Sequence, residues 1–341
     1  MAEQEAILIK DRTRLGAVCI AKVHVLNMIG NIEEAVANGL RACDLAASNH
    51  DPAQGLMANY FLAQAHEFSG DYQAAISILT RDLPGLTGEH RRTRFGMTGT
   101  NSVLHLSLLS HSYAYLGAMS EADAMAREAC AIANETGRPY DAGIAHFGDG
   151  IVKLCHGRID DAIESLQIGW QTCQDKNIAA LLPMIGCRLG FAYALKGDTE
   201  RAAELLNQSR NGSLGATHVH CWALTFSGWC EHRRGATSLA LSQQHEALRL
   251  ARKHGYRGIE MWALWFLGMT LSGVDRFAEA NDVLAEAAAL AKSLEMRLHA
   301  GYCQRALADV QQRLDASLSG GKIGLAAQVV GEERGLGRFI S

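Results

Sequence analysis

Residues 189–206, LGFAYALKGDTERAAELL, contain the pattern that decides the fold. Apolar residues recur at helical spacing on both sides of Gly197, which indicates two amphipathic helices joined by a short turn. Glycine adopts the left-handed conformation that ends a helix at low cost, and Asp198 can then cap the next helix. Gly190 and Ala202 are small, so the two helices can approach closely. The stretch therefore predicts a tight antiparallel helical pair.

The same pattern recurs along the chain, with successive turn glycines 40, 47, 40, 40 and 38 residues apart. A seventh copy, LSGVDRFAEA, has a turn two residues longer. One helical pair cannot bury its own apolar face, whereas stacked pairs can. The turn glycines are Gly30, Gly70, Gly117, Gly157, Gly197 and Gly235. An alanine follows five residues after each: Ala35, Ala75, Ala122, Ala162, Ala202 and Ala240.

These repeats predict an all-α protein, a right-handed α-solenoid of about seven to eight TPR-like helix–turn–helix units over residues 1–316. No stretch alternates with a period of two, so no strand is expected. Residues 317–341 are rich in glycine and predict a C-terminal tail outside the array. The first helices of the units are expected to begin near Asp11, Pro52, Thr98, Pro139, Ala179, Ala216, Tyr256 and Met296.

The spacing of Leu189-Gly190-x-x-Tyr193-x-x-x-Gly197, followed by Ala202, resembles the tetratricopeptide (TPR) signature. Segments 58–79, 91–117, 137–167 and 285–310 further resemble the C-terminal repeat region of class III adenylate/guanylate cyclase-type multidomain proteins and AAA/LuxR-like regulators. This resemblance implies a regulatory or docking role and places the first helices on the concave face. It implies no catalytic residue, because neither the cyclase domain nor a GxxxxGK[ST] phosphate loop is matched.

Composition excludes several classes of protein. The formal net charge is −4, from 32 basic and 36 acidic residues, so there is no broad field for nucleic acid or an anionic membrane. No apolar run reaches the roughly 18 residues of a membrane span. The nine cysteines include no CxxC pair and are expected to be buried hydrophobes of a reducing compartment. We therefore expect a cytoplasmic protein without cofactor or metal.

Candidate catalytic and metal-binding groups are weak. His218 and His220 are two apart, and on a helix such side chains point about 200° away from each other, so they cannot share an ion. The pair Glu33 and Glu34 lies at the start of a second helix, where acidic residues complement the helix dipole. No GxSxG elbow is present. The sequence therefore favours a protein that is not an enzyme.

Candidate binding residues lie on the first helices. The late aromatic residues are at helical spacing and have two interpretations, which are packing between units and the floor of a binding groove. These aromatic residues are Trp222, Phe226, Trp229, Trp262 and Trp265. The other groove candidates are Asn59, Tyr60, His105, His146, Lys153 and Arg188.

The second interval between turns is longer than the others because of residues 80–99. This segment contains Arg91, Arg92 and Arg94, which form either a solvated connection or a contact for an anion or acidic partner. The leading function is a scaffold that binds a protein or peptide in its concave groove within a signalling or regulatory system. The alternative is a small-molecule sensor module of a cyclase- or ATPase-linked protein. Self-association through the ends of the solenoid is a further expectation.

Overall fold

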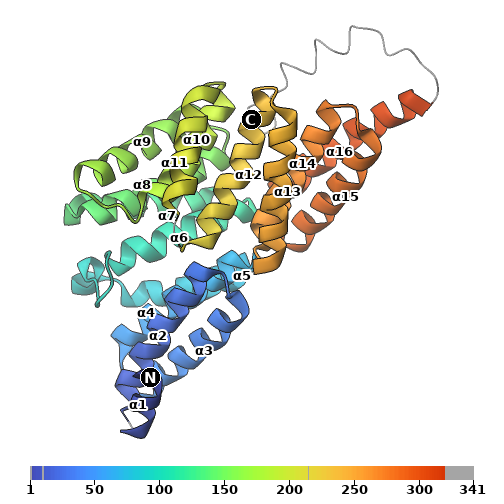
Figure 1. The fold of residues 1–341 in the computed structure, drawn as a ribbon. Helices are drawn as coiled ribbons and strands as arrows, with labels where there is room; N and C mark the ends of the chain where they lie inside the picture. Colours follow the sequence, from blue (N-terminus) through green and yellow to red (C-terminus); the bar gives the residue numbers. More distant parts are fainter. Residues whose placement is uncertain (1, 10, 214, 319–341) are drawn as a thin grey trace.

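The computed structural model describes residues 2–9, 11–213 and 215–318. Within these ranges all regular structure is helical, and successive helices pack as antiparallel pairs (Figure 1). The predicted all-α, TPR-like solenoid is confirmed, as seven pairs with α1 before them and α16 after them. The helices are α1 (Ala2–Leu8), α2 (Arg12–Ile29), α3 (Ile32–Ser48), α4 (Pro52–Phe68), α5 (Tyr72–Asp82), α6 (Asn101–Leu116), α7 (Met119–Thr136), α8 (Pro139–Cys155), α9 (Ile159–Asp175), α10 (Leu182–Lys196), α11 (Thr199–Gly212), α12 (Thr217–Arg233), α13 (Thr237–His254), α14 (Arg257–Gly273), α15 (Phe277–Ser293) and α16 (Arg297–Leu318).

The turn between paired helices is built as the sequence predicts. Gly197 has φ 94°, in the left-handed region, and the side chain of Asp198 accepts a hydrogen bond from the backbone N–H of Arg201 at 3.2 Å. At the first turn, by contrast, the side chain of Asn31 makes no cap hydrogen bond. In the longer seventh turn the left-handed residue is Asp275, with φ 60°.

Small residues allow the paired helices to touch. The alanine five residues after each of the six turn glycines has no exposed surface. A Cβ atom added at Gly190 would lie 2.8 Å from Leu206 Cγ and 3.1 Å from the carbonyl oxygen of Ala202. One at Gly150 would lie 2.4 Å from Leu166 Cγ. Backbone contact at these positions therefore fixes the distance between the two helices of a pair.

The helix boundaries follow the predicted starts to within three residues. Part of the insertion at residues 80–99 is helical. Helix α5 continues to Asp82, and two 3₁₀ turns follow, Leu83–Gly85 and Gly88–Arg92. All nine cysteines are free thiols. None of the described helices has the length and apolar character needed to cross a membrane. The predicted tail lies outside the described residues from residue 319 onward.

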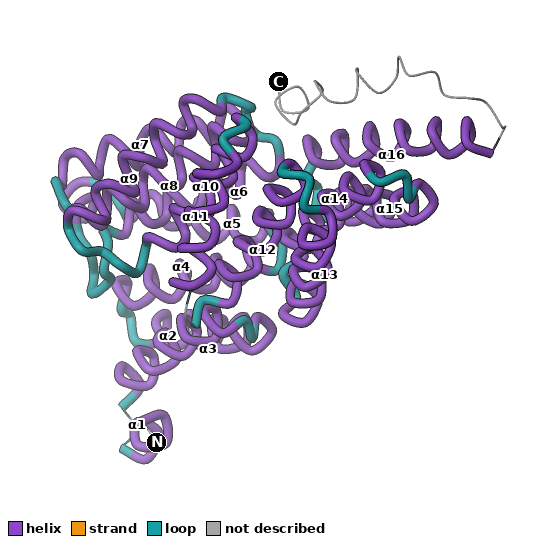
Figure 2. Tube along the Cα trace, turned by 45° about the horizontal axis from the view of Figure 1, so that its top comes forward, coloured by secondary structure: helices purple, strands orange, loops and turns teal. Residues whose placement is uncertain are grey.

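The array curls until its early and late units meet. Thr217 donates a hydrogen bond to the carbonyl of Met28 at 3.2 Å, and His254 Nδ1 lies 3.1 Å from the carbonyl oxygen of Gly30. Helix α12 contacts α2, and α16 contacts α6. Figure 2 shows α12 and α13 beside the N-terminal helices. The first helices therefore face a common interior.

The contact at Gly190 yields a stability prediction. Gly190→Leu should lower the free energy of unfolding by about 1–3 kcal/mol, because the side chain must force α10 and α11 apart. Urea unfolding followed by circular dichroism measures this change. Gly301→Leu in α16 is the control, since a Cβ there meets nothing within 4 Å. Equal effects of the two substitutions would contradict the packing argument.

Candidate ligand-binding cavity

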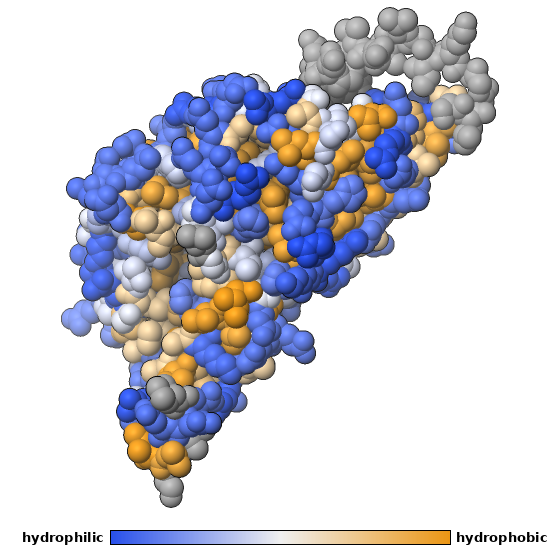
Figure 3. Space-filling view, viewed as in Figure 1, coloured by the Kyte–Doolittle hydropathy of each residue, from blue (hydrophilic) through white to orange (hydrophobic). Residues whose placement is uncertain are grey.

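A cavity of about 620 Å³ lies on the inner side of the array. Its walls come from the first helices of six consecutive units, α2, α4, α6, α8, α10 and α12. The segments Gly96–Gly99 and Ala180–Leu181 complete the wall. In the space-filling view, weakly polar and apolar surface gathers between the N-terminal helices and the units above them, bordered by hydrophilic surface (Figure 3). The curl of the solenoid therefore creates a concave site that no single unit contains.

The lining of this cavity is mainly apolar and aromatic. Aromatic rings come from five of its six helices, and sulfur atoms of methionine add flexible apolar surface. Such a lining with a few convergent polar groups is typical of ligand pockets. The aromatic lining residues are Tyr60, Phe61, Phe68, Tyr115, Tyr140, Phe147 and Trp222, with the imidazoles of His24, His111 and His218. The methionines are Met28, Met57, Met97 and Met184.

Arg188 on α10 is the main charged group of the wall. Its side chain is 6 % exposed, and its guanidinium carbon lies 3.8 Å from the centroid of the Trp222 ring. The guanidinium donates one hydrogen bond, to the hydroxyl of Tyr115 at 3.0 Å. Among the described residues, no carboxylate lies within the 4.0 Å of an ion pair with Arg188. A cation–π contact thus stands where a buried arginine usually has a carboxylate.

Other titratable groups face the same space, among them Glu67, His111 and His218. Glu67 on α4 pairs with His111 on α6, with 3.7 Å between Oε1 and Nδ1. His218 on α12 stacks on Phe68, with ring centroids 4.3 Å apart. Burial, and secondarily the charge of Arg188, lower the pKa of His218 to about 3. His218 is therefore a neutral imidazole in the cavity at physiological pH.

Only three of the predicted groove residues line the cavity: Tyr60, Arg188 and Trp222. The other late aromatic residues lie in the core between units, where they stack on one another and on Phe191 and Phe266. Of the two interpretations, packing between units describes their position. These residues are Phe226, Trp229, Trp262 and Trp265, at 0 %, 4 %, 5 % and 1 % exposure.

The remaining groove candidates belong to polar networks behind the cavity wall. Asn59 donates to Asp82 at 2.9 Å, and the same carboxylate lies 3.2 Å from His105 Nε2. Lys153 lies 2.7 Å from the carboxylate of Asp149 on its own helix. His146, the last candidate, lies 3.1 Å from the hydroxyl of Ser165. These contacts satisfy buried polar groups within the array.

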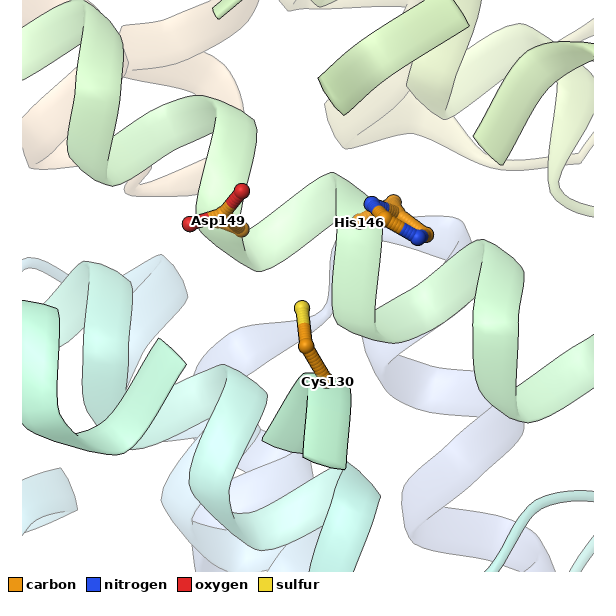
Figure 4. A group of neighbouring side chains, drawn as sticks. All are labelled: Cys130, His146 and Asp149. Carbon is orange, nitrogen blue, oxygen red and sulfur yellow. The ribbon is translucent and has the colours of Figure 1, made fainter. Parts of the chain in front are cut away.

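Cys130, His146 and Asp149 form a group with the spacing of metal ligands, with the ligand atoms within 4.8 Å of one another (Figure 4). The carboxylate of Asp149 already accepts a hydrogen bond from Ser165 at 2.5 Å and forms an ion pair with the ammonium of Lys153. Burial raises the pKa of the Cys130 thiol to about 12, which disfavours the thiolate that a metal needs. We therefore assign no metal to this group.

Arg91 and Arg92 of the insertion form ion pairs within the chain. Arg91 pairs with Glu128 and Glu135 of α7, and Arg92 pairs with Glu135 at 2.9 Å. The backbone carbonyl of Arg94 accepts a hydrogen bond from Asn101. The insertion therefore anchors its 3₁₀ turn on α7 through Arg91 and Arg92.

Most cavity residues carry no signal in the repeat pattern. Phe61, Phe68, His111, Tyr115 and His218 lie on first helices, but each unit has its own residues there. These residues share the inner face of their helices. In α4 the lining side chains are three or four residues apart, which is the spacing of one helix face. Assigning that face as inner requires the curvature of the array.

Comparisons with known proteins identify the fold. No protein-family model and no curated protein matches the chain. Similar solved structures include a Rap protein complexed with Competence and Sporulation Factor, 12 % identical, covering 88 % of this chain and 98 % of that one, TM-score 0.52. Another is the Rap conjugation gene regulator of plasmid pLS20 with the Phr* peptide, 12 % identical, covering 88 % and 97 %, TM-score 0.51. The chain is thus a TPR-like helical-repeat protein, and neither neighbour is a cyclase-type or AAA/LuxR-like protein.

The neutral state of His218 yields a pH prediction. Below pH 6.5 the unfolded chain binds a proton on this side chain that the folded chain does not. The free energy of unfolding therefore decreases as the pH is lowered from about 6.5 to about 3. His218→Phe keeps the ring stacked on Phe68 and removes this loss. Between pH 7 and pH 5 the variant should gain about 2 kcal/mol relative to the native chain.

Urea unfolding at the two pH values measures the difference. His299→Phe provides an independent replicate outside the main cavity, because burial also lowers the pKa of His299 to about 3. Parallel loss of stability in the native chain and in both variants would contradict a neutral buried imidazole.

Proposed function

We propose that this chain is a non-catalytic receptor that binds a short peptide in the cavity and thereby regulates a partner protein in a signalling system. The cavity formed by six first helices carries this proposal, because it joins a large apolar lining to a few polar groups. Its volume lies within the range of about 300–1,000 Å³ that ligand pockets occupy. Methionine and aromatic side chains suit a ligand with several apolar side chains.

The two similar structures support a peptide as the ligand class. One of them is described in complex with Competence and Sporulation Factor, and the other with the Phr* peptide. At 12 % identity the likeness concerns the fold alone, so a peptide ligand for this chain is part of the proposal. The lining residues of this chain, in particular Phe61, Phe68 and Trp222, provide the independent argument.

A small-molecule sensor is the second candidate function. The convergence of six helices on one cavity of drug-sized volume favours it. A link to a cyclase or ATPase remains a prediction from the sequence alone, as does self-association through the ends of the array. We also propose a cytoplasmic location, for which the nine free thiols are the supporting observation.

A substitution that fills the cavity tests the proposal. Ala21 on α2 lines the cavity and has an exposed side chain, so Ala21→Trp should block the space without disturbing the core. A library of random pentapeptides is selected on the immobilised chain, and the affinities of the enriched sequences are measured by isothermal titration calorimetry. We expect Ala21→Trp to weaken binding at least about tenfold, which corresponds to about 1.4 kcal/mol.

Ala37→Trp is the matched control, because Ala37 is an exposed alanine of α3 that does not line the cavity. Circular dichroism establishes that both variants are folded. Unchanged peptide binding in Ala21→Trp would exclude the cavity as the peptide site. A small molecule that co-purifies with the native chain and not with Ala21→Trp, with no peptide bound, would favour the sensor function.

A further inference from the structure

The wall of the cavity contains a positive charge that the fold itself does not neutralise. Arg188 is buried, yet it lines the cavity, so a ligand can reach its guanidinium. The guanidinium contacts the hydroxyl of Tyr115 and lies near the aromatic rings of Trp222 and Phe226. A guanidinium has five N–H donors, and one hydrogen bond to Tyr115 leaves most of them for another acceptor.

Maintaining such a charge inside a fold is costly. Transfer of a cation from water into an apolar site is unfavourable unless an opposite charge compensates it. The ring of Trp222 offsets part of this cost through the cation–π contact. That contact also holds the guanidinium beside the indole ring, and Tyr115 is its one hydrogen-bond partner among the described residues. An arginine held in this way is preorganised for a planar anion, which it can bind with two parallel hydrogen bonds.

Two neighbouring groups complete a polar corner around Arg188. The hydroxyl of Tyr115 accepts from Arg188 and still has its own proton to donate. The Nδ1 atom of His218 is buried without a hydrogen-bond partner, and the His218 side chain lines the same cavity as Arg188. Glu67, an acid of the cavity lining, is paired with His111. Arg188 and Tyr115 therefore present donors at the cavity wall without a carboxylate of their own.

We propose that Arg188, with Tyr115 and His218, binds a carboxylate of the ligand, while the aromatic and methionine lining holds the apolar body. This inference rests on the proposed function and specifies its ligand class as an apolar molecule with a free carboxylate. For a peptide, the C-terminal carboxylate is that group, and for a fatty acid it is the headgroup.

Paired probes test the carboxylate directly. Pentapeptides of apolar residues are used as one library with a free C-terminus and one with a C-terminal amide, and octanoate is compared with octanamide. On the full chain, the carboxylate form of at least one pair should bind about ten to a hundred times more tightly than the amide. Selectivity in the peptide pair identifies a peptide terminus, and selectivity in the octanoate pair identifies a fatty carboxylate.

Three variants assign the effect to the charge and shape of Arg188. Arg188→Met should remove the preference for the carboxylate, and Arg188→Lys, which keeps the charge without the planar fork, should retain part of it. Glu67→Gln removes a negative charge from the same cavity and should strengthen carboxylate binding two- to tenfold. Circular dichroism and the affinity for the amide probes show whether each variant keeps its fold and cavity.

Equal affinity for carboxylate and amide probes, or a preference that survives Arg188→Met, would overturn the inference. Peptides that bind in the cavity without this preference would leave the proposed function intact. Binding that is insensitive to Ala21→Trp would refute the proposed function itself, so the two failures are distinguishable.

Discussion

The close contact within each helical pair is the constraint on which the rest of the structure depends. Alanines such as Ala202 have no exposed surface, and glycines such as Gly190 bring a helix backbone against its neighbour. Because the same contact recurs in successive units, each pair is placed on the previous one with a similar rotation. Those rotations sum to a curl, and the curl brings α12 against α2. The cavity is thus a consequence of repeated backbone contacts.

The repeat could be predicted from sequence because its determinants are local. A left-handed glycine, a small residue at a fixed offset and a period of about 40 residues are all readable in one stretch. The cavity could not be predicted in this way, because His218 and Phe68 meet only after three intervening units have stacked. For the same reason Trp222 and Trp262, which look equivalent in sequence, separate into a wall residue and a core residue.

Polar groups divide into two kinds with different roles. Asp82, His105 and Asn59 satisfy one another, and Arg91 and Arg92 are neutralised on α7. Such groups fix the stacking of units and have little left to offer a ligand. Arg188 is the exception, since its partners within the described residues are uncharged. Residue type alone does not separate these roles, because the difference lies in what the neighbouring unit supplies.

The contact between the early and late units also restricts how this array can vary. An open solenoid tolerates gain or loss of an internal unit, because each unit touches only its neighbours. Here the turn at Gly30 meets Thr217, His254 and Tyr256 across more than half of the chain. Deleting one pair, for example α8 with α9, would shift that register by a whole unit and bring other side chains to the turn at Gly30. The contacts of α12 with α2 and of α16 with α6 both join units five apart, so the side chains at these contacts are matched to the number of units in one turn of the array.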